Sequence, residues 1–260
     1  MNLSSTKVML DELTMFYNRT EFIEHDPISL PHRYTRKEDI EISGFLSATI
    51  SWGNRTTILK NGIRLMNLMD DQPFYFIKDA GNSDLRHFKD FVHRTFNESD
   101  ILFFIESLQN IYRNYSGLEA VFAEGFSEDE KDVYSAILNF RRVFLSLPHL
   151  IRTEKHIANP SKGSTAKRIN MFLRWMVRRD NCGVDFGLWN TISPSQLCCP
   201  LDVHSARSAR KLGLLLRTQN DWKAVIELTD NLRIFDPKDP IKYDFALFGA
   251  GIDNSSFSKK

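Results

Sequence analysis

Apolar residues recur every three or four positions through most of the chain, which is the spacing of one buried face of an α-helix. The segment KVMLDELTMFYN shows this spacing first, and EDIEISGFLSATISW and TTILKNGIRLMNLM continue it. Later segments with the same spacing are SDILFFIESLQNIYRNY, DVYSAILNFRRVFLSL, STAKRINMFLRWMVRR, VHSARSARKLGLL, NDWKAVIELTDNLRIF and PIKYDFALFGAGI. Strand-type alternation bounded by hairpin turns is absent. The pattern predicts an all-α protein of roughly ten or more helices.

Prolines separate these periodic segments, and we find no internal repeat and no low-complexity linker between them. A chain of 260 residues is long enough for one large domain or for two lobes that share a core. We expect a single two-lobed helical unit. One lobe is central and covers residues 38–150, and the other combines residues 1–37 with residues 151–260.

The composition is typical of a soluble globular protein, with 42% hydrophobic and 26% charged residues. No window holds the roughly 18 consecutive apolar residues of a membrane span, and the amphipathic N-terminal segment lacks the pattern of a signal peptide. Three cysteines, Cys182, Cys198 and Cys199, are too few for a disulfide framework and lack the spacing of a zinc or iron–sulfur site. We therefore expect a cytoplasmic protein that does not bind membranes.

Positive charge is concentrated in one part of the chain, although the formal net charge is only +1. Between Arg152 and Arg217 there are twelve Lys and Arg residues against four Asp and Glu residues, which leaves a local excess of eight positive charges. A local basic surface on a nearly neutral protein is typical of phosphate binding. The alternative is that these cations cover solvated helix faces. If the segment binds DNA, reversing the charge of Lys162 or Arg178 should weaken the salt dependence of binding.

A single acidic residue stands where a basic helix is predicted to begin, in the stretch PLDVHSARSARKLGL. Aspartate is a preferred N-cap, because its side-chain oxygen accepts the free N–H groups of the first helical turn. Asp202 is therefore interpreted first as a capping residue. The other interpretation is a catalytic carboxylate that the helix holds toward an anionic substrate, and the pattern alone leaves both open.

These segments also carry a resemblance to a known superfamily. GSTAKRINMFLRWMVRR followed by PLDVHSARSARKLGL resembles the second half of the helix-hairpin-helix DNA glycosylases, in which a glycine-containing hairpin joins two helices and an Asp-x-His element precedes a later helix. ISGFLSATISWGNRTTILKNGIRL is similar to the early helix and the loop that probes the duplex, and KYDFALFGAGI resembles the late helix that lines the base pocket of the 8-oxoguanine branch. The whole chain is similar to a family of bacterial proteins of this length that form a distant branch of the superfamily.

The chain departs from the superfamily pattern at the hairpin. The usual hairpin reads Leu-Pro-Gly-hydrophobic-Gly followed by Lys or Thr and Ala, whereas ANPSKGSTAKR keeps one glycine, Gly163, and Ala166. This difference weakens the expected grip on phosphate. The iron–sulfur cysteines of the endonuclease branch are also missing, which selects a branch without changing the fold.

The resemblance implies roles for the hairpin and for the Asp-x-His element. Gly163, Ser164 and Thr165 are expected to bind a DNA phosphate through backbone N–H groups and hydroxyls. Asp202 is expected to stabilise the positive charge that develops on the sugar when the base leaves. A lysine amine would attack C1′, and here Lys167 and Lys162 remain alternatives, each of which is otherwise an ordinary exposed or phosphate-binding cation.

Each remaining candidate residue has an alternative interpretation as an ordinary surface or core residue. His204 and Arg207 are expected to contact the DNA backbone, or else to be ordinary helix-surface residues. Enzymes that act on a base extrude it from the stack, and the loop after the early helix offers Asn54 and Arg55 as the residues that fill the gap or read the opposite base. The expected lining of the base pocket, each member of which would otherwise be core, is Trp52, Asp244, Phe245 and Phe248.

Arg174 is expected to pair with Asp185 and to hold the loop after its helix, which we interpret as architecture. The sequence thus predicts a monomeric DNA repair glycosylase that binds double-stranded DNA, excises a damaged purine such as 8-oxoguanine and has AP-lyase activity if a lysine is suitably placed. The alternatives are a catalytically inactive DNA-binding protein with the same fold, and an RNA- or nucleotide-binding protein that uses the same basic face. No cofactor is expected, and whether a monovalent cation binds at the hairpin stays open.

Overall fold

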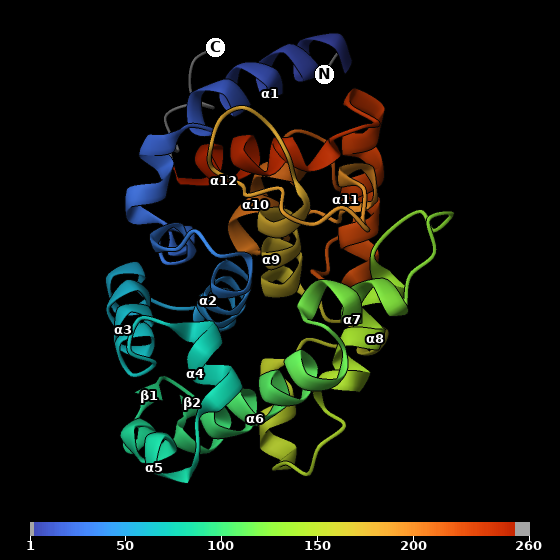
Figure 1. Cartoon of the computed structure of the whole chain (residues 1–260). Coiled ribbons are helices and arrows are strands. Elements are labelled where there is room, and N and C mark those ends of the chain that lie inside the picture. The colour runs from blue at the N-terminus through green and yellow to red at the C-terminus, as the bar shows by residue number, and fades with distance from the viewer. Residues whose placement is uncertain (1–2, 253–260) are drawn as a thin grey trace. The chain divides into compact units, whose positions relative to one another are not determined.

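The computed structural model describes residues 3–252, and the chain in this range is mainly helical (Figure 1). The prediction of a helical protein is confirmed. The α-helices of the described residues are α1 Leu3–Tyr17, α2 Lys37–Ile50, α3 Arg55–Asn67, α4 Pro73–Asp79, α5 Asn82–Leu85, α6 Glu98–Asn114, α7 Leu118–Glu124, α8 Tyr134–Phe144, α9 Lys167–Val177, α10 Val203–Lys211, α11 Trp222–Phe235 and α12 Asp244–Ile252.

One small sheet was not predicted from the sequence. Strands β1 (Val92–His93) and β2 (Phe96–Asn97) pair antiparallel across a two-residue turn at Arg94 and Thr95. Arg94 has a left-handed φ of +55°, which suits a tight hairpin turn. Each strand is two residues long, so the alternation that reveals a strand in a sequence has no room to appear.

The chain forms two compact units, each made of segments that are distant in sequence. The first unit comprises Met1–Phe22, Glu128–Val133 and Asn159–Lys260, and the second comprises Ile23–Ser127 and Tyr134–Ala158. The lobes expected from the sequence had their boundaries at residues 37/38 and 150/151 instead. All candidate catalytic residues lie in the first unit.

An aromatic core holds the second unit together. Phe45 of α2 stacks on Phe104 of α6 at 5.8 Å between ring centroids, and Phe140 and Phe144 of α8 each approach Phe45 at 5.4 Å. All four side chains are fully buried. Offset-stacked and edge-on ring pairs add to the free energy of apolar burial, so this cluster fixes α2, α6 and α8 against one another.

The first unit is built around α9 and α12. Helix α12 packs against both α1 and α10, and Figure 1 shows α1 and α12 side by side. From Ile169 to Arg178 only Met171 is not buried, so almost the whole circumference of α9 is covered. A helix covered all round is a rigid base, and the candidate residues stand at its beginning.

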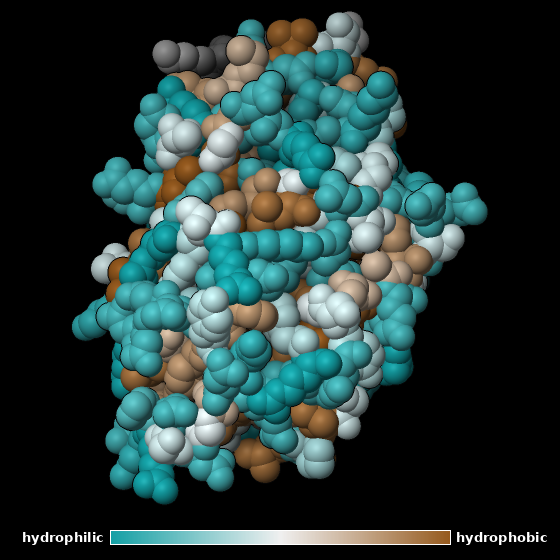
Figure 2. All heavy atoms as spheres, viewed as in Figure 1, coloured by the Kyte–Doolittle hydropathy of each residue, from teal (hydrophilic) through white to brown (hydrophobic). Residues whose placement is uncertain are grey.

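The visible surface is mainly polar, as the composition predicts. On the face seen in Figure 2, hydrophilic residues predominate and hydrophobic residues form small separate groups. Among the helices of residues 3–252, none is long and apolar enough to cross a bilayer.

Candidate active site

Asp202 is the N-cap of α10. Its backbone is extended, and its Oδ1 accepts hydrogen bonds from the backbone N–H groups of His204 at 2.8 Å and Ser205 at 2.9 Å. In return, the backbone N–H of Asp202 donates to the hydroxyl of Ser205 at 2.9 Å, which completes a capping box. These bonds fix the orientation of the carboxylate at the start of the helix.

The second oxygen of the same carboxylate points to a lysine. Asp202 Oδ2 lies 2.9 Å from Nζ of Lys167, with 21% of the aspartate side chain and 30% of the lysine side chain exposed. Burial acts to raise the pKa of Asp202, but the positive charge of Lys167 and the hydrogen bonds to the carboxylate outweigh it and hold this pKa below its ordinary value. The cap and the ion pair therefore use different oxygens of one side chain, so the two interpretations of Asp202 do not exclude each other.

Lys167 is the first residue of α9, and it follows a loop with little regular structure. The loop starts at the 3-10 helix Pro160–Lys162 and turns at Gly163, whose φ of +84° is left-handed. No atom lies within 4 Å of the point where a Cβ on Gly163 would be, so a ligand has room to approach this backbone closely. Between α8 and α9, within the described residues, the chain forms two 3-10 helices, Ile151–His156 and Pro160–Lys162, and no α-helix.

The loop is fastened at several points. The carbonyl of Asn159 accepts the N–H groups of Lys162 and Ser164, each at 3.2 Å, and the carbonyl of Gly163 accepts the N–H of Trp222 at 3.2 Å. The hydroxyl of Ser164 accepts the N–H of Ala166, also at 3.2 Å. Ser164 therefore supports the loop from within, and Thr165 is half-buried beside it.

The two candidate nucleophiles are in different surroundings. Lys167 contacts Asp202, whereas Lys162 is exposed and forms no ion pair with any residue in the described range 3–252. The structure thus brings one of the two predicted lysines to the predicted catalytic carboxylate, across 35 residues of sequence. Lys162 remains a solvent-exposed cation beside Gly163.

His204 and Arg207 are both exposed on the first two turns of α10. They are three residues apart, so they lie on the same side of the helix. The backbone N–H of His204 is one of the two that Asp202 accepts. Their placement leaves both side chains accessible for contacts to a DNA backbone.

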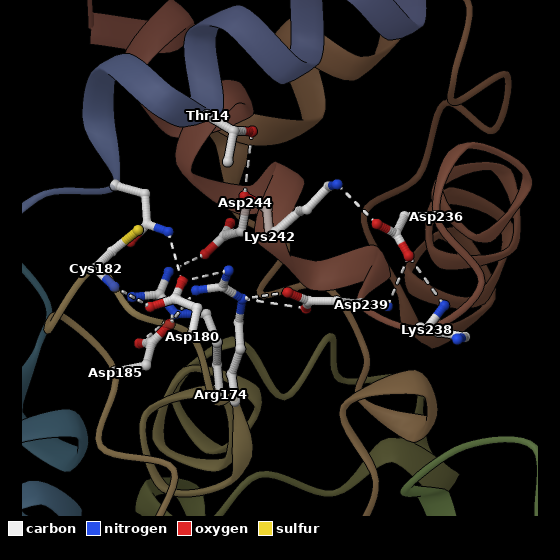
Figure 3. Close-up of polar contacts among 12 residues, drawn as sticks. Thr14, Arg174, Asp180, Cys182, Asp185, Asp236, Lys238, Asp239, Lys242 and Asp244 are labelled. Carbon is white, nitrogen blue, oxygen red and sulfur yellow. Dashed lines mark hydrogen bonds and ion pairs between the residues drawn. The ribbon is translucent and has the colours of Figure 1, made fainter.

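Two arginines of the basic segment are buried in the core of the first unit. Arg174 Nε lies 3.2 Å from Asp185, which confirms the predicted pair. Arg178 reaches three carboxylates, Asp185 at 2.9 Å, Asp180 at 2.7 Å and Asp239 at 3.0 Å. Figure 3 shows these three acids near Arg174. Only 2% of Arg178 is exposed, so the prediction that it contacts DNA phosphate is wrong. The acidic partners come from two loops, and no local sequence pattern indicates the contact with Asp239.

Two of the predicted base-pocket residues of α12, Asp244 and Phe245, face this buried network. Asp244 is hydrogen-bonded to Arg174, and its pKa is raised because burial outweighs the opposing charge of that arginine. Phe245 is buried under the guanidinium of Arg174, 4.4 Å from its ring centroid. Phe248 is half-buried, with Phe22 at 6.1 Å between the rings. As arranged here, Asp244 and Phe245 pack α12 onto α9, and a role in binding a base stays a prediction.

The candidate residues of the second unit lie where α2 leads into α3. Asn54 caps α3, because its side chain accepts the N–H of Thr57 at 3.2 Å, and Arg55 is the exposed first residue of that helix. The ring of Trp52 is edge-on to His93 at 5.0 Å and stacked on His156 at 5.7 Å. Trp52 is therefore part of an aromatic cluster and only partly exposed.

Sequence reasoning missed two residues at the start of α9. Ala166 has a left-handed φ of +48°, and nothing in the sequence signals this conformation for an alanine. Asn170 is 1% exposed, and its side chain donates to the carbonyl of Thr165 at 3.1 Å. A polar residue on the apolar side of the segment STAKRINMFLRWMVRR is the signal that could have found it.

In residues 3–252, no group of three or more His, Cys, Asp or Glu side chains is placed to hold a metal ion. No curated protein and no solved structure matches the chain. The family model described as "Protein of unknown function (DUF2400)" matches residues 26–253, which is most of the sequence. The chain therefore belongs to the DUF2400 family.

Proposed function

We propose that this protein is a DNA N-glycosylase with AP-lyase activity that excises a damaged purine, such as 8-oxoguanine, from double-stranded DNA. The observation that carries the proposal is the contact of 2.9 Å between Lys167 Nζ and Asp202 Oδ2. The two residues come from the starts of different helices and are partly exposed together. A carboxylate and an amine within one sugar's width of each other are the two groups that this reaction requires.

Asp202 would act on the departure of the base. When the N-glycosidic bond breaks, its electron pair leaves with the base, and the sugar gains oxocarbenium character at C1′. A carboxylate held in place beside C1′ stabilises this charge without reorganising. The capping bonds to His204 and Ser205 hold the carboxylate in this way, and its lowered pKa keeps it ionised at neutral pH.

Lys167 would act as the nucleophile. In the ion pair it is an ammonium, so it first gives one proton to the departing base, and the neutral amine then forms a bond to C1′. A second proton of that nitrogen passes to the ring oxygen as the sugar ring opens, which gives a Schiff base from which the strand is cleaved. Asp202 Oδ2 contacts Nζ, so the carboxylate holds this nitrogen in place. The assignment of Lys167 rather than Lys162 follows from this contact.

The loop before α9 would bind the DNA backbone. Gly163 has open space above it, and Lys162 is exposed beside it. The N-cap of α9 is Ala166, whose methyl side chain cannot cap the first-turn N–H groups, and such groups favour an anion. His204 and Arg207 would add contacts from α10.

A catalytically inactive DNA-binding protein is the second candidate. The observation that favours it is the double engagement of Asp202, since Oδ1 is held by two backbone N–H groups and Oδ2 by Lys167. These contacts are sufficient to account for Asp202 as a structural residue without a catalytic role. The departures of the hairpin from the glycosylase pattern point in the same direction.

The test is an excision assay with duplexes that each carry one damaged purine, 8-oxoguanine included. The purified protein is expected to release at least one of these bases, and Asp202→Asn is expected to bind the same duplex without releasing it. Binding without release of any base by the unmodified protein would leave the inactive DNA-binding protein.

A further inference from the structure

The start of α9 is strained, and the strain lies beside the proposed nucleophile. Ala166 precedes Lys167 directly and has φ +48° and ψ +33°. This left-handed region is unfavourable for a residue with a Cβ, because that atom comes close to the following carbonyl oxygen. A conformation of this kind persists only where the surrounding structure holds it. Some contact at this loop must therefore oppose the strain.

Asn170 makes that contact. Its Nδ2 donates to the carbonyl of Thr165 at 3.1 Å, which reaches back over the strained residue, while its backbone N–H donates to the carbonyl of Ala166 at 2.9 Å. One residue therefore holds the peptide groups on both sides of Ala166. Helix α9 has no side-chain cap at Ala166. The side chain of Asn170 accepts none of the first-turn N–H groups, but it ties the helix to the carbonyl of the residue before Ala166.

The stability of the core does not explain Asn170. The residue is 1% exposed among the apolar side chains of α9, and its Oδ1 is buried with no hydrogen-bond partner. A buried polar atom without a partner costs free energy that an apolar residue of similar shape avoids. A side chain that satisfies one carbonyl and leaves its own oxygen unpaired is better suited to fixing a geometry than to adding stability.

We propose that Asn170 is the positioning residue of Lys167: it holds Ala166 in the left-handed conformation and so fixes the first residue of α9 and the loop before it relative to Asp202. This inference rests on the proposed function as far as catalysis is concerned. Lys167 is the terminal residue of its helix, where the backbone frays unless it is held. We call the hydrogen bond from Asn170 to the carbonyl of Thr165 the clamp. Losing the clamp should disturb the contact between Lys167 and Asp202 while α9 stays in place.

The test uses Asn170→Leu, because leucine has the same branching and number of side-chain heavy atoms but cannot donate to Thr165. We expect the melting temperature to be maintained or raised, and the trapping of lesion-containing DNA by borohydride to fall about tenfold to a hundredfold, as for a misplaced catalytic group. Asn170→Ala serves as a second variant in case leucine does not fit. Equal trapping by a folded Asn170 variant and the unmodified protein would overturn the proposal.

The decisive arm is a rescue by glycine. Glycine adopts the left-handed region freely, so Ala166→Gly removes the strain that Asn170 has to oppose. We expect the double variant of Asn170→Leu with Ala166→Gly to trap DNA as well as Ala166→Gly alone does. The matched control is Ser116→Gly, which relieves a similar conformation, φ +62°, in the second unit and should rescue nothing. Failure of Ala166→Gly to rescue would show that Asn170 acts by packing alone.

The clamp can also be observed without DNA or activity. Reductive methylation with 13C-labelled formaldehyde gives each lysine an NMR signal, and Lys167→Arg identifies the one from Lys167. The chemical shift of this signal at a fixed pH should change in Asn170→Leu, because the surroundings of the amine change, and should return in the double variant with Ala166→Gly. An unmodified protein that shows this pattern but never traps DNA would refute the proposed function and retain the clamp. An unchanged chemical shift in Asn170→Leu would refute the clamp whatever the activity.

Discussion

Lys167 and Asp202 form a pair of one cation and one anion in which 30% and 21% of the side chains remain exposed, whereas Arg174 and Arg178 lie buried among four carboxylates of the same unit. Both groups combine basic and acidic side chains, and each includes one residue of α9, Lys167 or Arg174. The two groups differ in exposure, because a ligand can reach the pair but not the buried arginines. Figure 3 shows how the acidic side chains of the buried group converge on the arginines from several segments.

This difference separates architecture from chemistry. A buried charge cannot lose its partner without a large cost in free energy, so the arginine network serves to join α9, α12 and the loops after them. A partly exposed pair contributes little to stability, so Lys167 and Asp202 can exchange each other for a substrate. Substitutions in the buried network should therefore have the largest effects on stability.

Arg178→Ala should cause the largest loss. It leaves Asp185 with one cation in a site where the aspartate side chain is fully buried, and it removes the partner of Asp180 and Asp239. Breaking a buried pair costs about 3–5 kcal/mol, which urea denaturation would measure. The control is Arg207→Ala, an exposed arginine for which a change within about 0.5 kcal/mol is expected. Equal stability of the two variants would contradict the structural role assigned to the buried arginines.

Asp202→Asn should separate stability from activity. Asparagine caps a helix about as well as aspartate, and the lost ion pair is worth about 1 kcal/mol or less, so the variant should fold and bind DNA. Excision should fall by a factor of about 100 to 1,000, the usual loss on removing one electrostatic stabiliser of a transition state. Single-turnover base release is the measurement. A large loss of stability with excision retained would make Asp202 a cap alone.

Exposed cations, and not the buried arginines, should determine the salt dependence of DNA binding. Each phosphate contact adds close to one unit to the slope of log K against log salt, so Lys162→Gln should lower that slope by about one. Arg207→Gln should do the same. Binding titrations between roughly 50 and 200 mM salt measure the slope. Affinity that is indifferent to salt over this range would exclude phosphate contacts as its main source.

The smallest expected effect concerns how the stability of the fold depends on pH. Asp202 and Asp244 should contribute to this dependence with opposite signs. The pKa of Asp202 is lowered on folding, so its contribution to stability is present above its unfolded pKa of about 3.9 and is lost as the pH falls through the folded value. The pKa of Asp244 is raised, chiefly by burial, so its contribution is largest below the unfolded pKa and is lost as the pH rises.

Urea unfolding of Asp202→Asn and Asp244→Asn between about pH 3 and 7 tests this difference. Relative to the unmodified protein, Asp202→Asn should become less stable as the pH rises, and Asp244→Asn should become more stable. The same sign for both variants would contradict the contrast between the exposed pair and the buried network.

Much of this arrangement was predictable from local sequence. Apolar periodicity predicted the helices, the capping preference of aspartate predicted the role of Asp202 at α10, and the short separation of Arg174 and Asp185 predicted their pair. The burial of Arg178 was not predictable, because its partner Asp239 is 61 residues away and no local pattern links them. The conformation of Ala166 was missed for a related reason: alanine favours helix, and no sequence pattern indicates the hydrogen bonds that Ser164 and Asn170 form on either side of it.

Borohydride trapping on a duplex that contains an excisable purine tests the central claim most directly. A Schiff base between Lys167 and C1′ is reduced to a stable amine, so the unmodified protein should give a covalent adduct with DNA. Lys167→Gln should abolish this adduct, while slower base release continues because Asp202 still stabilises the sugar cation. Lys162→Gln is the matched control and should trap normally. An adduct that persists in Lys167→Gln and disappears in Lys162→Gln would contradict the assignment made from the contact between Lys167 and Asp202.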